Sequence, residues 1–267
     1  AHMERTTFEV KSGKDHTGNY GASAARNAGK FVPDDKSAQR LAEAVSVNST
    51  ADVVFSDGGG EFVSQFGNKT DCALLGFVKW LGFDYAEIRS KPSFQEKDDD
   101  GGGTSLGVKT IPFSSESKRS AIAVRLPKKA NGDDGGIRFF VKGASEVIVG
   151  LCKYELVKGV NKRLSPERKA NLQQQVIGKM AKEAMRTICI AYKDFPAGPP
   201  EDWEEKTEYN GQKCRLCETD LTMLAICGIE DPIRDDVPEA IKLCNKAGID
   251  VRMVTGDNLQ TAISIAK

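Results

Sequence analysis

Apolar residues recur at helical spacing in several segments of this 267-residue chain, and these segments predict amphipathic helices. In the strongest of them, over residues 71–81, apolar side chains stand at positions 74, 75, 78 and 81. The predicted helices cover residues 37–46, 71–81, 144–151 and 165–185. The last has Pro166 in its first turn, where the N–H that proline lacks would have no partner.

Shorter apolar runs predict strands, most of them in the middle of the chain. They cover residues 7–10, 107–113, 120–125, 136–141, 187–192 and 221–229. Residues 131–136 read Asn-Gly-Asp-Asp-Gly-Gly, which is typical of the turn of a long hairpin. Glycine-, proline- or charge-rich segments predict loops over residues 56–60, 95–103 and 195–211. The whole pattern predicts an α+β fold in which helices flank an antiparallel sheet.

The pattern of predicted elements changes near residue 229. A helix is predicted over residues 237–247 with Gly248 at its C-terminal end, followed by a strand over 250–254 and a helix over 258–266. Alternating strands and helices are typical of a parallel doubly wound sheet, and this stretch has too few elements to complete one. We therefore expect a truncated α/β piece after the α+β domain.

Charge and hydropathy exclude several classes of function. The 38 Lys and Arg residues balance the 38 Asp and Glu residues, so no net field favours nucleic acid or an anionic membrane surface. The longest apolar runs are a few residues, far below the roughly 18 that a membrane helix needs. A soluble fragment with a local anion site is expected.

The cysteine and histidine content bears on redox and metal chemistry. Seven cysteines, an odd number, favour a reducing compartment over a disulfide framework. Cys214 and Cys217 have the spacing of half a zinc site, but the only histidines are His2 and His16, so ordinary thiols are favoured over a metal site. Residues 1–3, Ala-His-Met, resemble a cloning scar.

Three short strings place charge beside glycine or proline next to a predicted strand, where backbone amides and side chains can meet a phosphate. In the first, residues 140–144, Lys142 is predicted at a strand end and Gly143 at the start of a helix. The others are Asp-Pro-Ile-Arg at 231–234 and Val-Thr-Gly-Asp-Asn at 254–258. A solvated lysine is the alternative for the first string, and a simple helix cap for the third.

Two further features suit a purine or a phosphate. Phe113, at a predicted strand end, is followed by Lys118 and Arg119, although a core phenylalanine before a solvated turn is the alternative. Arg186 could reach a phosphate oxygen, or close the preceding helix as a C-terminal cation. The sequence has no G-x-x-x-x-G-K-[ST] loop and no G-x-G-x-x-G before a helix, so an ATP site would need another architecture.

Taken in order, these strings resemble the P-type cation-transporting ATPases, and more closely the calmodulin-regulated plasma-membrane calcium pumps. The resemblance covers essentially the whole chain after the first few dozen residues. It is carried by residues 68–76, 113 with 118–119, 140–146, 231–234 and 253–258. It implies a nucleotide-binding domain over residues 4–228 and a partial, doubly wound phosphorylation domain over residues 229–267.

The resemblance also implies roles for single residues. Phe113 would stack on adenine, Lys142 and Gly143 would line the same pocket, and Lys118 would stand at its mouth. Asp71 would lie near the adenine amino group, where the family usually has Glu.

At the other end of the nucleotide, Arg186 would contact the phosphates. Thr255, Gly256 and Asp257 would receive the terminal phosphate and its Mg²⁺, and the hinge residues would be Asp231 and Arg234.

The departures from the family are equally informative. The phosphorylated aspartate of the family lies in Asp-Lys-Thr-Gly-Thr, which is absent here, as is the later Gly-Asp-Gly-x-Asn-Asp loop. We therefore expect no catalytic residue and no metal site, only binding of ATP with Mg²⁺ and no turnover.

The resemblance further implies an integral membrane parent that couples ATP hydrolysis, through an aspartyl-phosphate, to Ca²⁺ transport. This chain would be a monomeric cytoplasmic-loop fragment, and its partners the remaining phosphorylation, actuator and transmembrane domains. Calmodulin is a further candidate partner of the parent.

Two other classes of function stay open. Thr255 at a strand end suggests a haloacid-dehalogenase-like phosphatase, which release of phosphate from a generic aryl phosphate would favour, but no convincing nucleophilic Asp is found. Asp71 in place of Glu and the acidic glycine-rich insertions suggest a non-catalytic interaction module. Partner binding without nucleotide affinity would favour the second.

Overall fold

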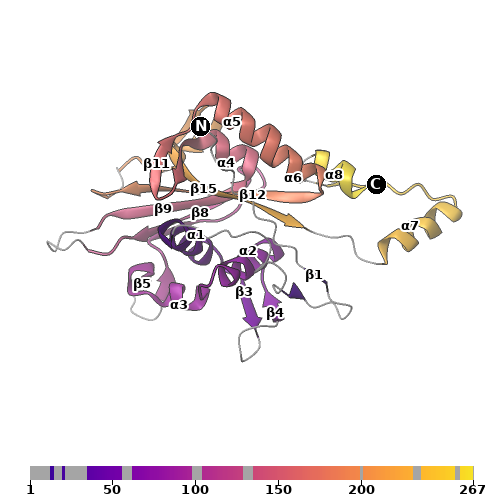
Figure 1. Cartoon of the computed structure of the whole chain (residues 1–267), viewed down its shortest axis with the longest axis horizontal. Coiled ribbons are helices and arrows are strands. Elements are labelled where there is room, and N and C mark those ends of the chain that lie inside the picture. The colour runs from indigo at the N-terminus through magenta and orange to yellow at the C-terminus, as the bar shows by residue number, and fades with distance from the viewer. Residues whose placement is uncertain are drawn as a thin grey trace.

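A seven-stranded mixed sheet lies at the centre of the fold (Figure 1). The computed structural model describes residues 13–14, 20–21, 35–55, 62–97, 104–128, 135–198, 201–230, 236–255 and 259–266. In order across the sheet, the strands are β11 (Val160–Arg163), β10 (Cys152–Val157), β15 (Leu221–Glu230), β12 (Met185–Phe195), β9 (Ile137–Ala144), β8 (Arg119–Arg125) and β7 (Lys109–Ile111). All neighbours are antiparallel except β10 and β15. The α+β fold is confirmed, and this one parallel pair makes the sheet mixed rather than purely antiparallel.

Helices cover both faces of the sheet (Figure 1). One face carries α1 (Asp35–Val47), α2 (Lys69–Trp80) and α3 (Tyr85–Ser90). The other carries α4 (Ser145–Leu151) and one continuous helical stretch made of α5 (Pro166–Asn171), a π-helical segment (Leu172–Ile177) and α6 (Gly178–Lys182). The helices predicted over residues 37–46, 71–81 and 144–151 are confirmed as α1, α2 and α4.

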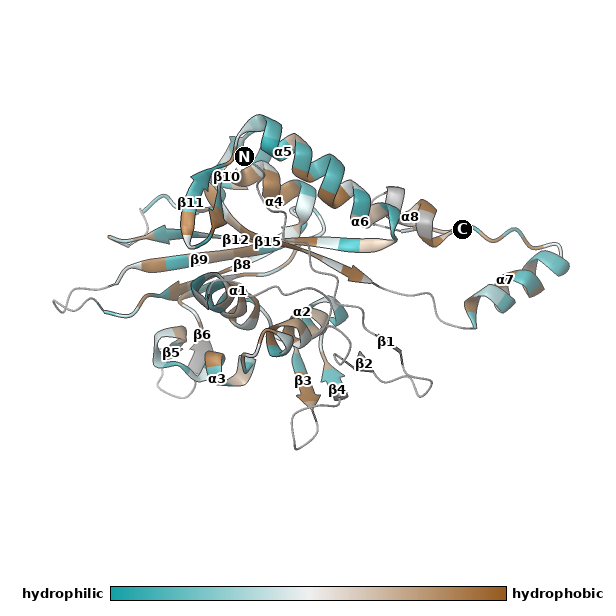
Figure 2. Ribbon diagram, in the orientation of Figure 1, coloured by the Kyte–Doolittle hydropathy of each residue, from teal (hydrophilic) through white to brown (hydrophobic). Residues whose placement is uncertain are grey.

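Alternation along the central strands builds a separate apolar core on each face, because successive side chains of a strand point to opposite sides. In β9, Phe139 and Val141 join the cluster that contains Ile148 of α4. Phe140, between them, joins the cluster that contains Leu75 of α2. Figure 2 shows the hydrophobic residues concentrated along the central strands and on the helix sides that face them.

The helix predicted over residues 165–185 is confirmed in type but ends at Lys182. Ala184 adopts a positive φ of 60°, which breaks the helix and reverses the chain into β12, which begins at Met185. Arg186 therefore lies inside a strand, where it pairs with Ile229 of β15, and not between the helix and the strand as predicted.

Small hairpins surround the central sheet. Beyond the seven strands, the short elements are β1 (Gly13–Lys14), β2 (Tyr20–Gly21), β3 (Asp52–Phe55), β4 (Phe62–Phe66), β5 (Gln95–Lys97), β6 (Thr104–Leu106), β13 (Lys206–Tyr209), β14 (Gln212–Arg215) and the 3₁₀ turns Pro92–Phe94 and Leu216–Glu218. The loops predicted over residues 95–103 and 195–211 are thus wrong in part, because β5 and β13 form inside them. The two strands of a hairpin are joined by hydrogen bonds between backbone groups, so a polar segment can form a strand without an apolar face. The strand predicted over 7–10 and the turn over 56–60 lie outside the described residues.

After β15, the chain contains α7 (Val237–Lys246) and α8 (Leu259–Ile265), which confirm two predicted helices. The strand predicted over 250–254 is wrong, because residues 249–255 have no regular structure and no described strand lies beside them to supply ladder hydrogen bonds. Val251, Met253 and Val254 are accordingly exposed. Among the described residues, no helix combines the length and the hydrophobicity needed to cross a bilayer.

Candidate functional site

Lys142 is a buried cation near the C-terminal end of β9. It alternates with Val141 and Gly143 in β9, so its side chain shares with Phe140 the face that α2 covers. The residue is only 8% exposed. Its Nζ donates to Oδ1 of Asp71 over 2.6 Å. The sequence predicted both residues for the same pocket, and the structure brings them into direct contact.

The position of Asp71 follows from the start of α2. The side chain of Asn68 accepts a hydrogen bond from the backbone N–H of Thr70, and this cap begins the helix. Asp71 then falls in the first turn, where a carboxylate is favoured by the positive end of the helix dipole. From there its carboxylate reaches the sheet and neutralises Lys142.

Burial lowers the pKa of Lys142 below its ordinary value of 10.5, because the charged ammonium loses water. The charge of Asp71 and its hydrogen bond oppose this shift, whereas the positive charge of Arg89 adds to it. Arg89 is fixed nearby, since its guanidinium donates to the carbonyl oxygens of Ser46, Ser49 and Ala51. Lys142 is therefore a desolvated cation that would gain from a further anion.

This lowered pKa gives stability a defined pH dependence. Because the unfolded chain holds the Lys142 proton more tightly, the folded state should gain stability as the pH rises through the folded pKa toward 10.5. Relative to a Lys142→Met variant, the wild type should therefore become more stable between pH 8 and pH 10. Urea unfolding of both proteins at the two pH values measures the difference. A difference that is constant, or that reverses, would contradict the assignment.

The turn between β7 and β8 carries the second part of the site. Phe113 is 64% exposed there, which is unusual for a large aromatic side chain and contradicts the alternative of a core phenylalanine. Lys118 has a left-handed backbone, with φ at 53°. Its N–H donates to the carbonyl of Ser114 over 2.8 Å, and its own carbonyl accepts from Ala144 N–H over 3.0 Å. The turn is thereby fastened to the end of β9.

Gly143 makes this close approach possible. It lies inside β9, paired with Arg119 on one side and Cys189 on the other, so the predicted helix start at this residue is wrong. A Cβ at position 143 would stand 2.4 Å from the carbonyl oxygen of Lys118 and 2.6 Å from Cβ of Arg119. Only glycine leaves room for the neighbouring strand.

The same end of the sheet carries further polar groups. In register with β9, Cys189 of β12 pairs with Gly143, so exposed Arg186 lies three residues beyond that pair, near the start of β12. The start of β8, the end of β9 and the start of β12 meet here. Lys118, Lys142 and Arg186 are thus brought to one end of the sheet.

Arg119 was predicted only as a cation beside Lys118, and the structure shows it buried. Its Nε and Nη2 donate to the two carboxylate oxygens of Glu218, each over 2.8 Å. Glu218 was not singled out in the sequence. A lone Glu near two cysteines gives no periodic signal that would reveal a partner 99 residues away.

Cys214 and Cys217 lie in the same region as buried free thiols. Burial is the main cause that raises the pKa of Cys217 to about 12, with the charge of Glu218 adding to it. A thiol held protonated in this way is a weak nucleophile.

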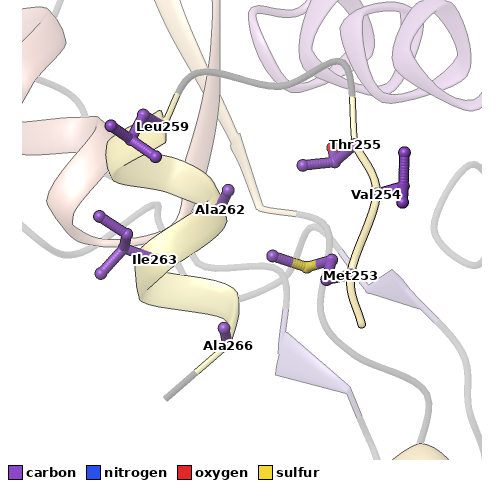
Figure 3. Close-up of a pocket in the computed structure, with 7 residues that line it drawn as sticks. All are labelled: Met253, Val254, Thr255, Leu259, Ala262, Ile263 and Ala266. Atoms are coloured by element: carbon purple, nitrogen blue, oxygen red, sulfur yellow. The ribbon is translucent and has the colours of Figure 1, made fainter. Parts of the chain in front are cut away.

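The predicted phosphate end is only partly described. Thr255 is exposed and lines a cavity of about 420 Å³ beside α8 (Figure 3). The cavity is lined by Met253, Val254, Thr255, Leu259, Ala262, Ile263 and Ala266. This lining is almost entirely apolar and includes none of the residues around Lys142, so the cavity is no extension of that site. Asp231, Arg234, Gly256 and Asp257 lie outside the described residues.

Comparison with known families gives one match over most of the chain. The family model described as "P-type ATPase, cytoplasmic domain N" matches residues 37–236. These residues include the whole central sheet and the helices on both of its faces. Residues 71, 113, 118, 142, 143 and 186 all lie within the match.

Several curated proteins are similar to the chain. Plasma membrane calcium-transporting ATPase 3 of Homo sapiens is 41% identical over 229 residues, which are 85% of this chain and 17% of that protein. Plasma membrane calcium-transporting ATPase mca-1 of Caenorhabditis elegans is 40% identical over 237 residues, 85% of this chain and 18% of the relative. Plasma membrane calcium-transporting ATPase 2 of Oreochromis mossambicus is 36% identical over 245 residues, 89% and 20% respectively. The chain spans a fifth or less of the length of these relatives.

Proposed function

Because the chain belongs to the P-type ATPase family and matches its cytoplasmic N domain, we propose that it binds ATP as the nucleotide-binding part of a calcium-transporting pump. The relatives named above are plasma membrane calcium-transporting ATPases, and this supports calcium as the transported ion of the parent. The observation that carries the proposal is that buried, desolvated Lys142 and exposed Phe113 lie at the same end of the sheet.

The proposed pose follows from the chemistry of these side chains. ATP would offer a purine, a triphosphate and the phosphoryl group that a pump transfers. Phe113 would stack on the purine, and an aromatic ring as exposed as this one is free to do so. Lys142 would line the same pocket beside Gly143, and Asp71 would accept from the adenine amino group.

The phosphates would extend toward the other cations at this end of the sheet. Lys118 would stand at the mouth of the pocket, and Arg186 would meet the phosphates. Thr255, Gly256 and Asp257 are proposed to receive the terminal phosphate and its Mg²⁺. Asp231 and Arg234 are proposed as the hinge to the phosphorylation domain.

The domain boundaries and the setting of the chain are also proposals. Residues 4–228 would form the nucleotide-binding domain, and 229–267 would belong to the phosphorylation domain. The aspartate that accepts the phosphoryl group would lie elsewhere in the parent, so this chain would bind ATP without hydrolysing it. It would work with the actuator and transmembrane domains on the cytoplasmic side, and calmodulin would act on the parent.

A titration with ATP tests the proposal at Phe113. Loss of the stacked ring in Phe113→Ala should weaken ATP binding by about fivefold to tenfold, as expected for a contact of roughly 1 kcal/mol or slightly more. Val160→Ala is the matched control, since Val160 is 60% exposed on the opposite edge strand and should leave affinity unchanged. Backbone amide shifts follow both titrations. A wild type with no saturable response at high millimolar ATP would refute ATP binding. An affinity of Phe113→Ala equal to that of the wild type would show that the ring is not part of the site.

A further inference from the structure

Lys118 holds a backbone conformation that a lysine adopts only under constraint. A left-handed φ costs a residue with a Cβ on the order of 1 kcal/mol, and it persists only when the surroundings over-determine it. Its φ is 53°, and it closes the turn that exposes Phe113. Something in the structure must therefore hold this turn.

Hydrogen bonds from the side chain of Arg119 hold the turn in place. Nη1 donates to the carbonyl of Ser117, inside the turn, over 3.0 Å. Nη2 donates to the carbonyl of Lys213, in strand β14, over 3.1 Å. The guanidinium thus ties the Phe113–Lys118 turn to the β13–β14 hairpin, which begins 87 residues after Arg119 in the sequence.

Glu218 fixes the orientation of that guanidinium. It accepts from Nε and Nη2 of Arg119 in a bidentate pair and also accepts from the N–H of Arg215 over 2.7 Å. Arg119 and Glu218 are 5% and 1% exposed. A buried ion pair adds little net stability over an apolar pair of the same size, so its use here is to specify a geometry.

We infer that Arg119, oriented by Glu218, is a positioning residue of the nucleotide site: it sets the turn that presents Phe113 and Lys118. The expected effect on ATP binding rests on the proposed function. The positioning of the turn does not, because it is a property of the unliganded chain. Neither side chain needs to touch the nucleotide. The β13–β14 hairpin, remote in sequence, thereby becomes part of the support of the site.

Lysine at position 119 is the discriminating substitution. It keeps the positive charge and loses the planar fork that reaches Glu218, Ser117 and Lys213 together. The matched control is Arg138→Lys. Arg138 also lies in β9 where this strand pairs with β8, but at the opposite end of β9 from Lys142. It forms a bidentate ion pair with Asp194, with distances of 2.6 and 2.8 Å.

Hydrogen exchange of the unliganded protein is the first measurement. The Ala144 N–H donates to the carbonyl of Lys118, so it reports whether the turn is held. In Arg119→Lys this amide should exchange about tenfold faster relative to the slowest amides of β12, which report global unfolding. In Arg138→Lys the ratio should stay at the wild-type value. Equal ratios in the two variants would overturn the inference, whatever the protein does with ATP.

ATP titration is the second measurement. The dissociation constant should rise about tenfold in Arg119→Lys and stay unchanged in Arg138→Lys, in line with the sensitivity of a site to misplaced groups. A wild type that does not bind ATP refutes the proposed function and leaves the exchange result to decide the positioning role. If Arg119→Lys does not fold, Glu218→Gln is measured in its place, because it keeps the shape and one acceptor oxygen and should give the same two changes. Wild-type behaviour in that variant would overturn the inference.

Discussion

Substitution of Gly143 by alanine should destabilise the domain by about 1–3 kcal/mol, the range typical of overpacking in a close-packed interior. The new Cβ would meet the Lys118 carbonyl oxygen at 2.4 Å and the Arg119 Cα at 2.8 Å. Both are backbone atoms, one at the end of the turn and one in the paired strand β8, so no side-chain rotation can relieve the overlap. Strand β8 would have to move away from β9 at the point where the Lys118 turn is attached.

Urea unfolding measures this loss, and Gly76→Ala is its matched control. Gly76 lies inside α2, and a Cβ there would have no heavy atom within 4 Å. Alanine is the better helix former, so this variant should be stabilised by about 0.5–1 kcal/mol. Opposite signs are therefore expected from the same chemical change. A neutral Gly143→Ala would mean that the two strands are not as close as the structure has them.

The central strands β8, β9, β12 and β15 could be predicted because they carry apolar side chains on a buried face. Phe139, Phe140 and Val141 form a continuous apolar run because β9 is covered by helices on both sides, and the run is visible in the sequence. Strand β11, by contrast, is exposed along its whole length and reads Val-Asn-Lys-Arg. It forms by backbone pairing with β10, which periodicity does not register.

The helices were predicted well because an amphipathic pattern and its end signals agree. In α2, Leu74, Leu75 and Val78 face the core, and Asn68 caps the start. The end of the long helix was misplaced because its stop is a left-handed Ala184, a residue type that gives no warning in a sequence.

The site shows the same division between local and distant information. Lys142 and Phe113 could be singled out because each belongs to a local string. The contact of Lys142 with Asp71 joins residues 71 apart, and the pair of Arg119 with Glu218 joins residues 99 apart. The first pair depends on the packing of α2 on the sheet and on the strand register that places Lys142, and the second on the packing of the turn after β14 against the start of β8. A single sequence carries no direct record of that register.

Removal of Lys142 should have the largest effect on ATP binding. In Lys142→Met the apolar side chain keeps the length of the four-carbon lysine stem and loses the charged nitrogen. The Lys142 ammonium would donate a charge-assisted hydrogen bond to the nucleotide. Such a bond contributes about 1.5–3 kcal/mol, so the dissociation constant for ATP should rise roughly 10- to 150-fold. Amide-shift titration measures the change, with Lys153→Met as the control, since Lys153 pairs with Asp220 at the other end of the sheet.

The partner variant Asp71→Ala separates the stability of the pair from its role in binding. It leaves the buried ammonium without its carboxylate, and loss of one member of a buried pair costs about 3 kcal/mol. The double variant Lys142→Met/Asp71→Ala removes both charges and should recover most of that loss, because no desolvated charge is left uncompensated. It should nevertheless bind ATP no better than Lys142→Met alone. Urea unfolding of the four proteins gives the coupling between the two side chains. Additive losses in the double variant would show that the 2.6 Å contact contributes nothing, and a double variant with wild-type ATP affinity would exclude Lys142 from the nucleotide site.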